Sequence, residues 1–212
     1  MKPVILPFGK TIYQTDHGQS ITSDTAFVVE TILEQIQEEN LSVLELGSGN
    51  GIISIMLAHY RPNWQISGLE IQKELMILSK RNAELAEVKI DFQEADLKNF
   101  QSSFRFDLII SNPPYFPVNQ GKISPIPERA ISRHEISCKM IDIFQTVKRN
   151  LKPDGKAFLL YPEERLAEAE KNVKKVDLKL ASKFIMPAVK SRKKIVLKLE
   201  KAEEYIIGVD EC

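Results

Sequence analysis

Three closely spaced glycines could bring the backbone next to a ligand. Gly47, Gly49 and Gly51 follow the apolar run Ser42–Leu46 and precede a second apolar segment. Glycine adopts positive φ readily and has no side chain to keep a ligand away, so such a loop can turn tightly beside a cofactor. A pyrophosphate-binding turn has the spacing G-x-G-x-x-G, whereas this loop is G-x-G-x-G. The acidic Glu45 also disfavours phosphate and could accept hydrogen bonds from a cationic, amino-acid-like ligand.

Two further acidic residues follow predicted strands. Glu70 ends the segment Gln65–Glu70, where a carboxylate can chelate the two hydroxyls of a ribose. Asp96 could accept a hydrogen bond from an adenine amino group, and the neighbouring Leu97 could offer its N–H to a ring nitrogen. Because parallel strands end at one edge of a sheet, these carboxylates and Glu45 should line one site. The set fits a nucleoside with an amino-acid tail, although ordinary surface carboxylates at strand ends are the alternative.

A second motif, Asn112-Pro113-Pro114-Tyr115, directly follows the predicted strand Phe106–Ser111. An exocyclic amino group that attacks an electrophilic carbon must first take its nitrogen lone pair out of conjugation with the ring. The Asn112 side-chain oxygen and the Pro113 carbonyl could accept the two N–H bonds, so that the nitrogen moves toward tetrahedral geometry. Tyr115 could stack on a flipped-out base or a planar amide. The alternative is a rigid turn that only ends the strand.

The chain around these motifs alternates predicted strands and helices, which indicates an α/β fold. Helical crossovers make most of the strands parallel, whereas the last two strands are joined without a helix and should pair antiparallel. We therefore expect a mostly parallel seven-stranded sheet with a C-terminal antiparallel hairpin and helices on both faces. The predicted strands are 42–46, 65–70, 88–93, 106–111, 156–161, 179–186 and 195–199, and the predicted helices are 24–39, 52–59, 72–86, 135–150 and 163–175. Residues 1–22 are expected to form an extended arm, residues 23–212 a single domain, and Lys152–Gly155 a turn.

Composition limits the choice of partners. The chain of 212 residues has 29 Lys and Arg against 29 Asp and Glu, so any basic nucleic-acid-binding face must be local. Cys138 and Cys212 lie far apart and are expected to be free thiols. No apolar run has the length of a signal peptide or a membrane span, so we expect a cytoplasmic protein without membrane contact. The three histidines lack metal-ligand spacing, and we expect no metal site.

The segment Glu45–Gly51, taken with Glu70 and Asp96, resembles the class I methyltransferases. The resemblance implies a Rossmann-like fold and S-adenosylmethionine as the cofactor, with the glycine loop near the methionine moiety, Glu70 on the ribose and Asp96 on the adenine. The cofactor-binding residues expected on this basis are Thr22, Asp24, Glu45, Gly47, Ser48, Gly49, Gly51, Glu70, Ile71, Asp96, Leu97 and Asn112.

The Asn112–Tyr115 motif resembles the N/D-P-P-Y/F signature of amino methyltransferases that act on adenine N6, guanine N2 or glutamine N5. The segments Tyr115–Pro117, Glu128–Glu135, Ser20–Asp24 and Pro162–Leu166 are similar to the family that contains the bacterial adenine-37 N6-methyltransferase of valine tRNA. That resemblance implies methylation of adenine N6 in tRNA. The expected catalytic residues are Asn112, Pro113, Pro114 and Tyr115, and the expected substrate-binding residues are Tyr115, Phe116, Arg129, Arg133, His134, Lys190, Arg192 and Lys193.

Two other functions stay open from the sequence. The glutamine N5-methyltransferases are also similar at Asp24-Thr25 and Arg61–Trp64, but they carry a helical N-terminal substrate domain, and about twenty residues precede Ser23 here. The Arg133–Glu135 segment also departs from their pattern. A non-catalytic S-adenosylmethionine-binding domain is the third possibility, and the intact Asn112 and Gly51 argue against it.

Basic residues near the C-terminus give modest support for RNA. Lys171, Lys174 and Lys175 on one predicted helix, and the segment Lys190–Lys194, could follow a phosphate backbone. A solvated surface is the alternative. Arg129, Arg133 and His134 could likewise form a salt-bridge cluster that caps a helix. We expect the protein to be a monomer.

Overall fold

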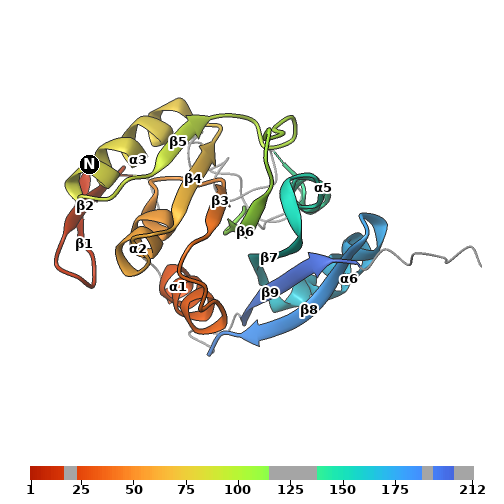
Figure 1. The fold of residues 1–212 in the computed structure, drawn as a ribbon. Helices are drawn as coiled ribbons and strands as arrows, with labels where there is room; N and C mark the ends of the chain where they lie inside the picture. The colour runs from red at the N-terminus through yellow and green to blue at the C-terminus, as the bar shows by residue number, and fades with distance from the viewer. Residues whose placement is uncertain (17–22, 115–137, 188–192, 203–212) are drawn as a thin grey trace, which may run out of the picture.

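A seven-stranded sheet forms the centre of the computed structural model, which describes residues 1–16, 23–114, 138–187 and 193–202. In spatial order the strands are β5 (Asp91–Glu94), β4 (Gln65–Glu70), β3 (Ser42–Leu46), β6 (Phe106–Ser111), β7 (Leu151–Pro162), β9 (Lys194–Lys201) and β8 (Leu178–Ile185). The strands from β5 to β7 are parallel, and β9 is antiparallel to both β7 and β8. The predicted sheet is therefore confirmed (Figure 1).

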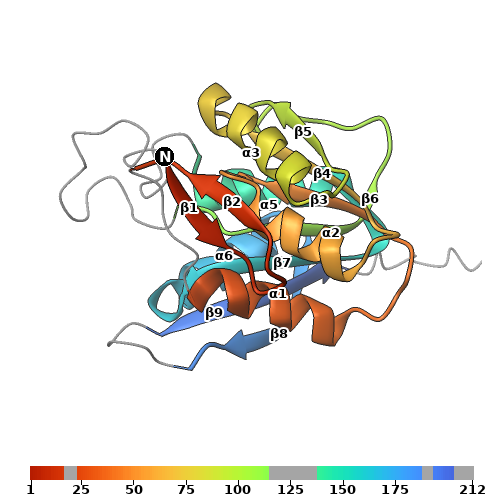
Figure 2. The same ribbon diagram turned by 90° about the vertical axis from the view of Figure 1, so that its left-hand side faces the viewer.

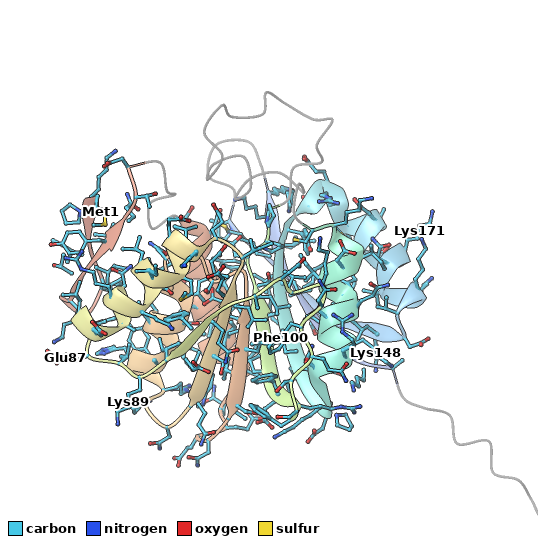
Figure 3. All side chains as sticks on the ribbon, turned by 90° about the horizontal axis from the view of Figure 1, so that it is seen from above. Met1, Glu87, Lys89, Phe100, Lys148 and Lys171 are labelled. Carbon is cyan, nitrogen blue, oxygen red and sulfur yellow. The ribbon has the colours of Figure 1, made fainter. Side chains whose placement is uncertain are left out.

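Helices cover both faces of the sheet, as predicted. One face packs against α1 (Ser23–Gln35), α2 (Ile52–Tyr60) and α3 (Lys73–Leu85). The other face packs against α5 (Met140–Asn150) and α6 (Leu166–Lys175), which follows the short 3₁₀ turn η1 (Glu163–Arg165). In Figure 3, Met1 and Glu87 mark the α3 side of the molecule, and Lys148 and Lys171 mark the α5 and α6 side.

Burial on both faces explains why the central strands are almost continuously apolar. Along β6, Leu108 and Ile110 belong to the core beneath α1 and α2, whereas Phe106 and Ile109 belong to the core beneath α5. All four side chains are nearly inaccessible to solvent. Each strand therefore joins the two cores and holds its carboxyl end in a fixed position.

The N-terminal residues form a β-hairpin, so the expectation of an extended arm was wrong. β1 (Lys2–Ile5) and β2 (Thr11–Gln14) pair antiparallel in a sheet of their own. Gly9 closes the hairpin with φ +83° and donates its N–H to the Leu6 carbonyl at 2.9 Å. Leu6 and Ile12 are buried in the core beneath α1 and α2. Figure 2 shows the hairpin beside the main domain next to α3.

Other predicted elements differ in detail. The helix predicted over 24–39 ends at Gln35, and the helix predicted over 135–150 begins at Met140. The predicted turn Lys152–Gly155 is part of β7, with a register shift opposite β6 between Phe106 and Leu108. Gly155 fits there because a Cβ would lie 2.8 Å from Leu151 Cδ1 and 3.1 Å from the Asp107 carbonyl oxygen, so both neighbours would have to shift. The strand predicted from residue 88 begins only at Asp91.

The order of the strands defines where a ligand can bind. From β3 the chain proceeds outward through β4 to β5, and it then returns to place β6 on the opposite side of β3. In an open α/β sheet such a reversal leaves a crevice outside the carboxyl ends of the two diverging strands, and ligands bind there. The glycine loop follows β3 and the Asn112 motif follows β6.

Candidate active site

Strand register brings the two motifs together. Leu46 of β3 lies opposite Leu69 of β4 on one side and opposite Ser111 of β6 on the other. The Ser111 hydroxyl donates to the Leu46 carbonyl at 2.7 Å and ties these two strand ends together. Gly47 and Asn112 therefore leave adjacent strand ends, on either side of the crevice.

The glycine loop has the tight, positive-φ backbone predicted for it. The φ angles are +71° at Gly47, +56° at Gly49 and +83° at Gly51. The N–H groups of Gly47 and Ser48 both donate to the Leu69 carbonyl at 2.9 Å, and Gly51 N–H donates to the Ser48 carbonyl at 2.8 Å. Because these amides are already hydrogen-bonded within the protein, the loop does not offer the ring of donors that a pyrophosphate requires.

Glu70 holds the loop from the neighbouring strand. One carboxylate oxygen accepts the Gly49 N–H at 2.9 Å, and the other accepts the Gln72 N–H at 2.9 Å. Burial raises the pKa of Glu70, and the hydrogen bonds from the backbone N–H groups of Gln72, Gly49 and Ile71 oppose this rise. A carboxylate has about four acceptor sites and three backbone N–H groups bond to this one, so Glu70 can still accept one hydrogen bond from a ligand hydroxyl.

Glu45 is the most deeply buried acid of the site. It is 2% exposed, and its Oε2 accepts hydrogen bonds from the hydroxyl of Ser54 at 2.5 Å and from the Ser54 backbone N–H at 3.2 Å. Burial raises the pKa of Glu45 to about 8; the Ser54 hydrogen bonds oppose this rise, and the nearby Glu70 carboxyl adds to it. A cationic ligand near these two carboxyls would compensate the cost of ionising them.

The turn that holds Asp96 is fixed by local contacts. Asp96 Oδ1 accepts the backbone N–H of Lys98 at 3.0 Å, and its Oδ2 lies 3.4 Å from the Lys98 ammonium. The Leu97 carbonyl accepts the Thr146 hydroxyl at 2.9 Å. The Asp96 side chain is 29% exposed and remains open to solvent.

Three features of this edge fit the nucleoside cofactor implied by the sequence. A Cβ at Gly47 or Gly49 would meet no atom within 4 Å, so the loop borders open space. The Ser48 hydroxyl is buried and has no hydrogen-bond partner among the described residues. Ile71 is 41% exposed directly after Glu70 and offers an apolar surface to a planar base.

Other predicted residues have mixed outcomes. Asn112 and Pro114 are half-buried, and Pro113 is buried. Asp24, at the start of α1, forms an ion pair with Lys194 at the start of β9, with side chains that are 11% and 14% exposed. Eight predicted site residues lie outside the described part of the chain: Thr22, Tyr115, Phe116, Arg129, Arg133, His134, Lys190 and Arg192.

The predicted basic residues do not all share one edge of the sheet. Lys193 is exposed and lies 3.9 Å from Glu163. It directly precedes β9, and the first residue of β9, Lys194, pairs with Pro162 at the carboxyl end of β7. Helix α6 runs from this end toward the opposite edge, where Lys174 and Lys175 form its last turn. Of these lysines, Lys193 is therefore nearer to the crevice.

Sequence reasoning missed Ser54 and Asn82. Ser54 lies in the first turn of α2 and bonds to Glu45, nine positions earlier in the chain. Asn82 in α3 is fully buried and bonds to Tyr13 and Asn50. Serine three residues after the Gly51 loop could have suggested the first contact, whereas no pattern in the sequence indicates the second.

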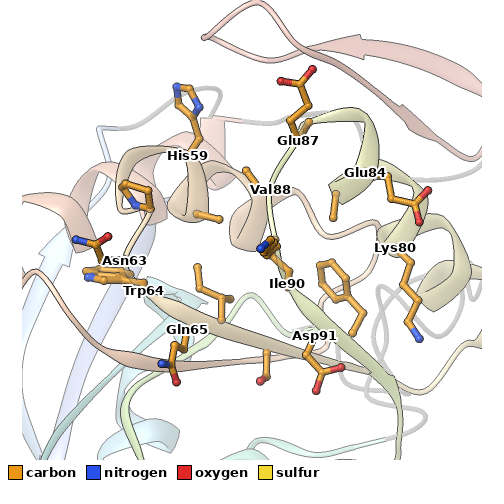
Figure 4. Close-up of a pocket in the computed structure, with 18 of the residues that line it drawn as sticks. His59, Asn63, Trp64, Gln65, Lys80, Glu84, Glu87, Val88, Ile90 and Asp91 are labelled. Atoms are coloured by element: carbon orange, nitrogen blue, oxygen red, sulfur yellow. The ribbon is translucent and has the colours of Figure 1, made fainter.

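A surface pocket of about 1150 Å³ lies elsewhere. Ser42, Gln65 and Asp91, the first residues of β3, β4 and β5, line it together with Trp64 and Phe92. Figure 4 shows the side chains that surround it, from His59 to Asp91. The pocket opens at the amino ends of the strands and contains none of the predicted site residues.

The described residues contain neither a cluster of metal-binding side chains nor a membrane-spanning helix. No group of three or more histidine, cysteine, aspartate or glutamate residues could hold a metal ion in that part of the chain. None of the helices described there is long and apolar enough to cross a membrane.

Two kinds of methyltransferase are similar to this chain in sequence. A tRNA1(Val) (adenine(37)-N6)-methyltransferase of Vibrio cholerae is 33% identical over 124 residues, which are 58% of this chain and 51% of the relative. A release factor glutamine methyltransferase of Lactococcus lactis is 35% identical over 97 residues, which are 46% of this chain and 36% of the relative. The matches thus span about a third to a half of the length of these relatives.

Solved structures share the fold. A methyltransferase from Pyrococcus furiosus superimposes with a TM-score of 0.66 at 18% identity, covering 91% of this chain and 90% of that one. A ribosomal protein L11 methylase from Lactobacillus delbrueckii gives a TM-score of 0.62 at 20% identity, covering 84% of this chain and 79% of that one. The family profile described as the methyltransferase small domain matches residues 19–176. The chain therefore belongs to the methyltransferase small domain family.

Proposed function

We propose that this protein is an S-adenosylmethionine-dependent methyltransferase that modifies an exocyclic amino nitrogen, with adenine N6 of a tRNA as the favoured target. The observation that carries the proposal is the strand register, which sets the Gly47 loop and Asn112 on adjacent strand ends at the reversal of the sheet. S-adenosylmethionine supplies, when bound, an electrophilic methyl group on a sulfonium.

The residues of this chain supply positioning. Glu70 would accept a hydrogen bond from the ribose, and Glu45 would compensate the positive charge of the methionine part. On the other side of the crevice, the Asn112 side-chain oxygen and the Pro113 carbonyl accept the two N–H bonds of the substrate amine, so that its lone pair points at the methyl group. The substrate nitrogen would take the methyl group, the sulfonium would leave as a neutral thioether, and the acidified nitrogen would then lose a proton to solvent. No strong base is required.

Adenine in tRNA is preferred over glutamine because a tRNA1(Val) (adenine(37)-N6)-methyltransferase of Dyadobacter fermentans matches 76% of this chain, at 27% identity. The release factor glutamine methyltransferase of Shewanella oneidensis matches 62% of the chain, at 33% identity. We also propose that Lys193, exposed beside the end of β7, contacts the RNA backbone.

The test is a methyl-transfer assay with labelled S-adenosylmethionine and two competing substrates, total unmodified tRNA and release factor. We expect label in the tRNA and N6-methyladenosine after nucleoside mass spectrometry. Asn112→Ala is the control that should abolish transfer, because it removes the side-chain oxygen that positions the substrate amine. Labelled N5-methylglutamine in the release factor would instead support the second candidate, which the 35% identity to a release factor enzyme favours. Cofactor binding without transfer to either substrate would contradict both.

A further inference from the structure

Asn82 connects the N-terminal hairpin to the glycine loop. Its Oδ1 accepts the backbone N–H of Tyr13 at 2.8 Å, and its Nδ2 donates to the Tyr13 carbonyl at 2.8 Å and to the Asn50 carbonyl at 2.9 Å. The side chain has no exposed surface. One buried amide therefore bonds to two segments that are far apart in the sequence, and both bonding groups of the amide are used.

The backbone N–H and carbonyl of Tyr13 bond to the Asn82 amide as they would to a neighbouring strand. Tyr13 lies opposite Pro3 in the β1–β2 pair, and Pro3 has no N–H to donate. Both backbone groups of Tyr13 are thus directed away from β1 and toward Asn82. The Arg81 guanidinium lies 5.4 Å from the centre of the Tyr13 ring and adds a cation–π contact.

Helix α3 also holds the glycine loop in place. A Cβ at Gly51 would lie 3.0 Å from Ser79 Cβ, so α3 touches the loop one turn before Asn82. The preceding Asn50 gives its carbonyl to Asn82. Any change in the position of this loop therefore changes the geometry of the amide that holds the hairpin.

We propose that Asn82 is a positioning residue that couples docking of the hairpin (residues 1–16) to cofactor binding at the glycine loop. The inference rests on the proposed function for the identity of the cofactor. A cofactor that holds the loop in the geometry recognised by Asn82 strengthens docking of the hairpin. By linkage, a docked hairpin strengthens cofactor binding by the same factor.

The test uses S-adenosylhomocysteine, which binds without reacting, and the full-length protein. In the wild type, this ligand should slow hydrogen exchange of the backbone amides of residues 11–14. Asn82→Asp keeps an acceptor for Tyr13 N–H but turns an oxygen toward the carbonyls of Tyr13 and Asn50. We expect it to raise the Kd for the ligand about tenfold and to remove the effect of the ligand on hairpin exchange. In turnover, the KM for S-adenosylmethionine should rise while kcat changes less than about twofold.

A second pair of variants changes Tyr13 in the hairpin and leaves the residues of α3 and of the glycine loop unchanged. Tyr13→Pro removes the N–H that Asn82 accepts and should raise the Kd about fivefold. Tyr13→Phe keeps both backbone groups and the ring, and it should bind like the wild type. Wild-type affinity in both Asn82→Asp and Tyr13→Pro would overturn the coupling while leaving the proposed function in place. A wild-type protein that fails to bind the ligand would overturn both.

Discussion

The carboxylate of Glu70 accepts the backbone N–H of Gly49, with 2.9 Å between the two heavy atoms. The acid at the end of β4 thereby holds the loop that follows β3, and its second oxygen holds the next turn through Gln72 N–H. A residue predicted to bind a ribose is thus also part of the framework that shapes the cofactor site.

Replacing Glu70 by Gln should therefore weaken both the fold and the site. In either orientation of the new amide, its NH2 group faces the N–H of Gly49 or that of Gln72, and a buried donor loses its acceptor. We expect a loss of about 1–3 kcal/mol in the free energy of unfolding and a clear rise in the Kd for S-adenosylhomocysteine. Urea unfolding and calorimetric titration measure these two quantities. Glu94→Gln, at the exposed position in register with Glu70 on β5, should change neither.

Stability should depend on pH through Glu45. Burial raises the pKa of this carboxyl from 4.5 in the unfolded chain to about 8 in the folded protein. Between these values the folded state binds more protons than the unfolded state, so the free energy of unfolding falls as pH rises. The contribution of Glu45 is fully present below pH 4.5 and is lost as pH passes about 8. Urea unfolding across this range should show the decline.

Glu45→Gln separates this contribution from others. The substituted side chain stays neutral and keeps an oxygen for the Ser54 hydroxyl, so the decline should become shallower. It should not vanish, because the pKa of Glu70 is raised as well. Glu84→Gln, at an exposed position of α3, is the control and should keep the wild-type slope. A Glu45→Gln protein with the wild-type slope would show that Glu45 is ionised in the fold.

Much of the sheet could be predicted because its strands are buried on both faces. Ser42–Leu46, Gln65–Glu70 and Phe106–Ser111 were predicted with their observed bounds. The start of the third strand was harder to predict, because the chain after α3 bends at Glu87, which has φ +59°. Its neighbour Val88 donates its N–H to the Ala83 carbonyl and so completes the end of the helix rather than a strand. Glycine usually occupies this position, and glutamate gives no such signal.

The site was only partly predictable for a similar physical reason. Strand ends and glycine spacing identify Glu45, Glu70 and the loop, because these features are local in the sequence. The contact between Asn82 and Tyr13 joins residues 69 positions apart, and that between Lys194 and Asp24 joins residues 170 positions apart. Such contacts follow from packing of complete elements, and neither composition nor periodicity encodes them.

Gly51 should tolerate alanine less well than Gly9, although both have φ +83°. At either position, alanine in the left-handed conformation should lower the free energy of unfolding by about 1–2 kcal/mol. At Gly51 the new Cβ would also lie 2.8 Å from Phe92 Cζ and 3.0 Å from Ser79 Cβ, whereas at Gly9 it meets nothing within 4 Å. Overpacking adds about 1–3 kcal/mol. Equal losses in urea unfolding would show that the loop can move away from α3.

The ion pair between Asp24 and Lys194 should stabilise the contact between α1 and β9. Both side chains are largely buried, so removal of one partner leaves an uncompensated charge. Lys194→Met should therefore cost about 3–5 kcal/mol in the free energy of unfolding. Lys193→Met, at the neighbouring position, is the control, because Lys193 lies 3.9 Å from Glu163 and the two side chains are 60% and 40% exposed; its loss should stay below about 1 kcal/mol.

A double-mutant cycle shows whether the loss at Lys194 comes from the pair itself. In the protein that carries both Asp24→Asn and Lys194→Met, neither member of this ion pair is left charged without the other. The combined loss should therefore be smaller than the sum of the two single losses by about 0.5–3 kcal/mol. Strict additivity would mean that the two charges do not interact in the fold and that water compensates the charge of Asp24.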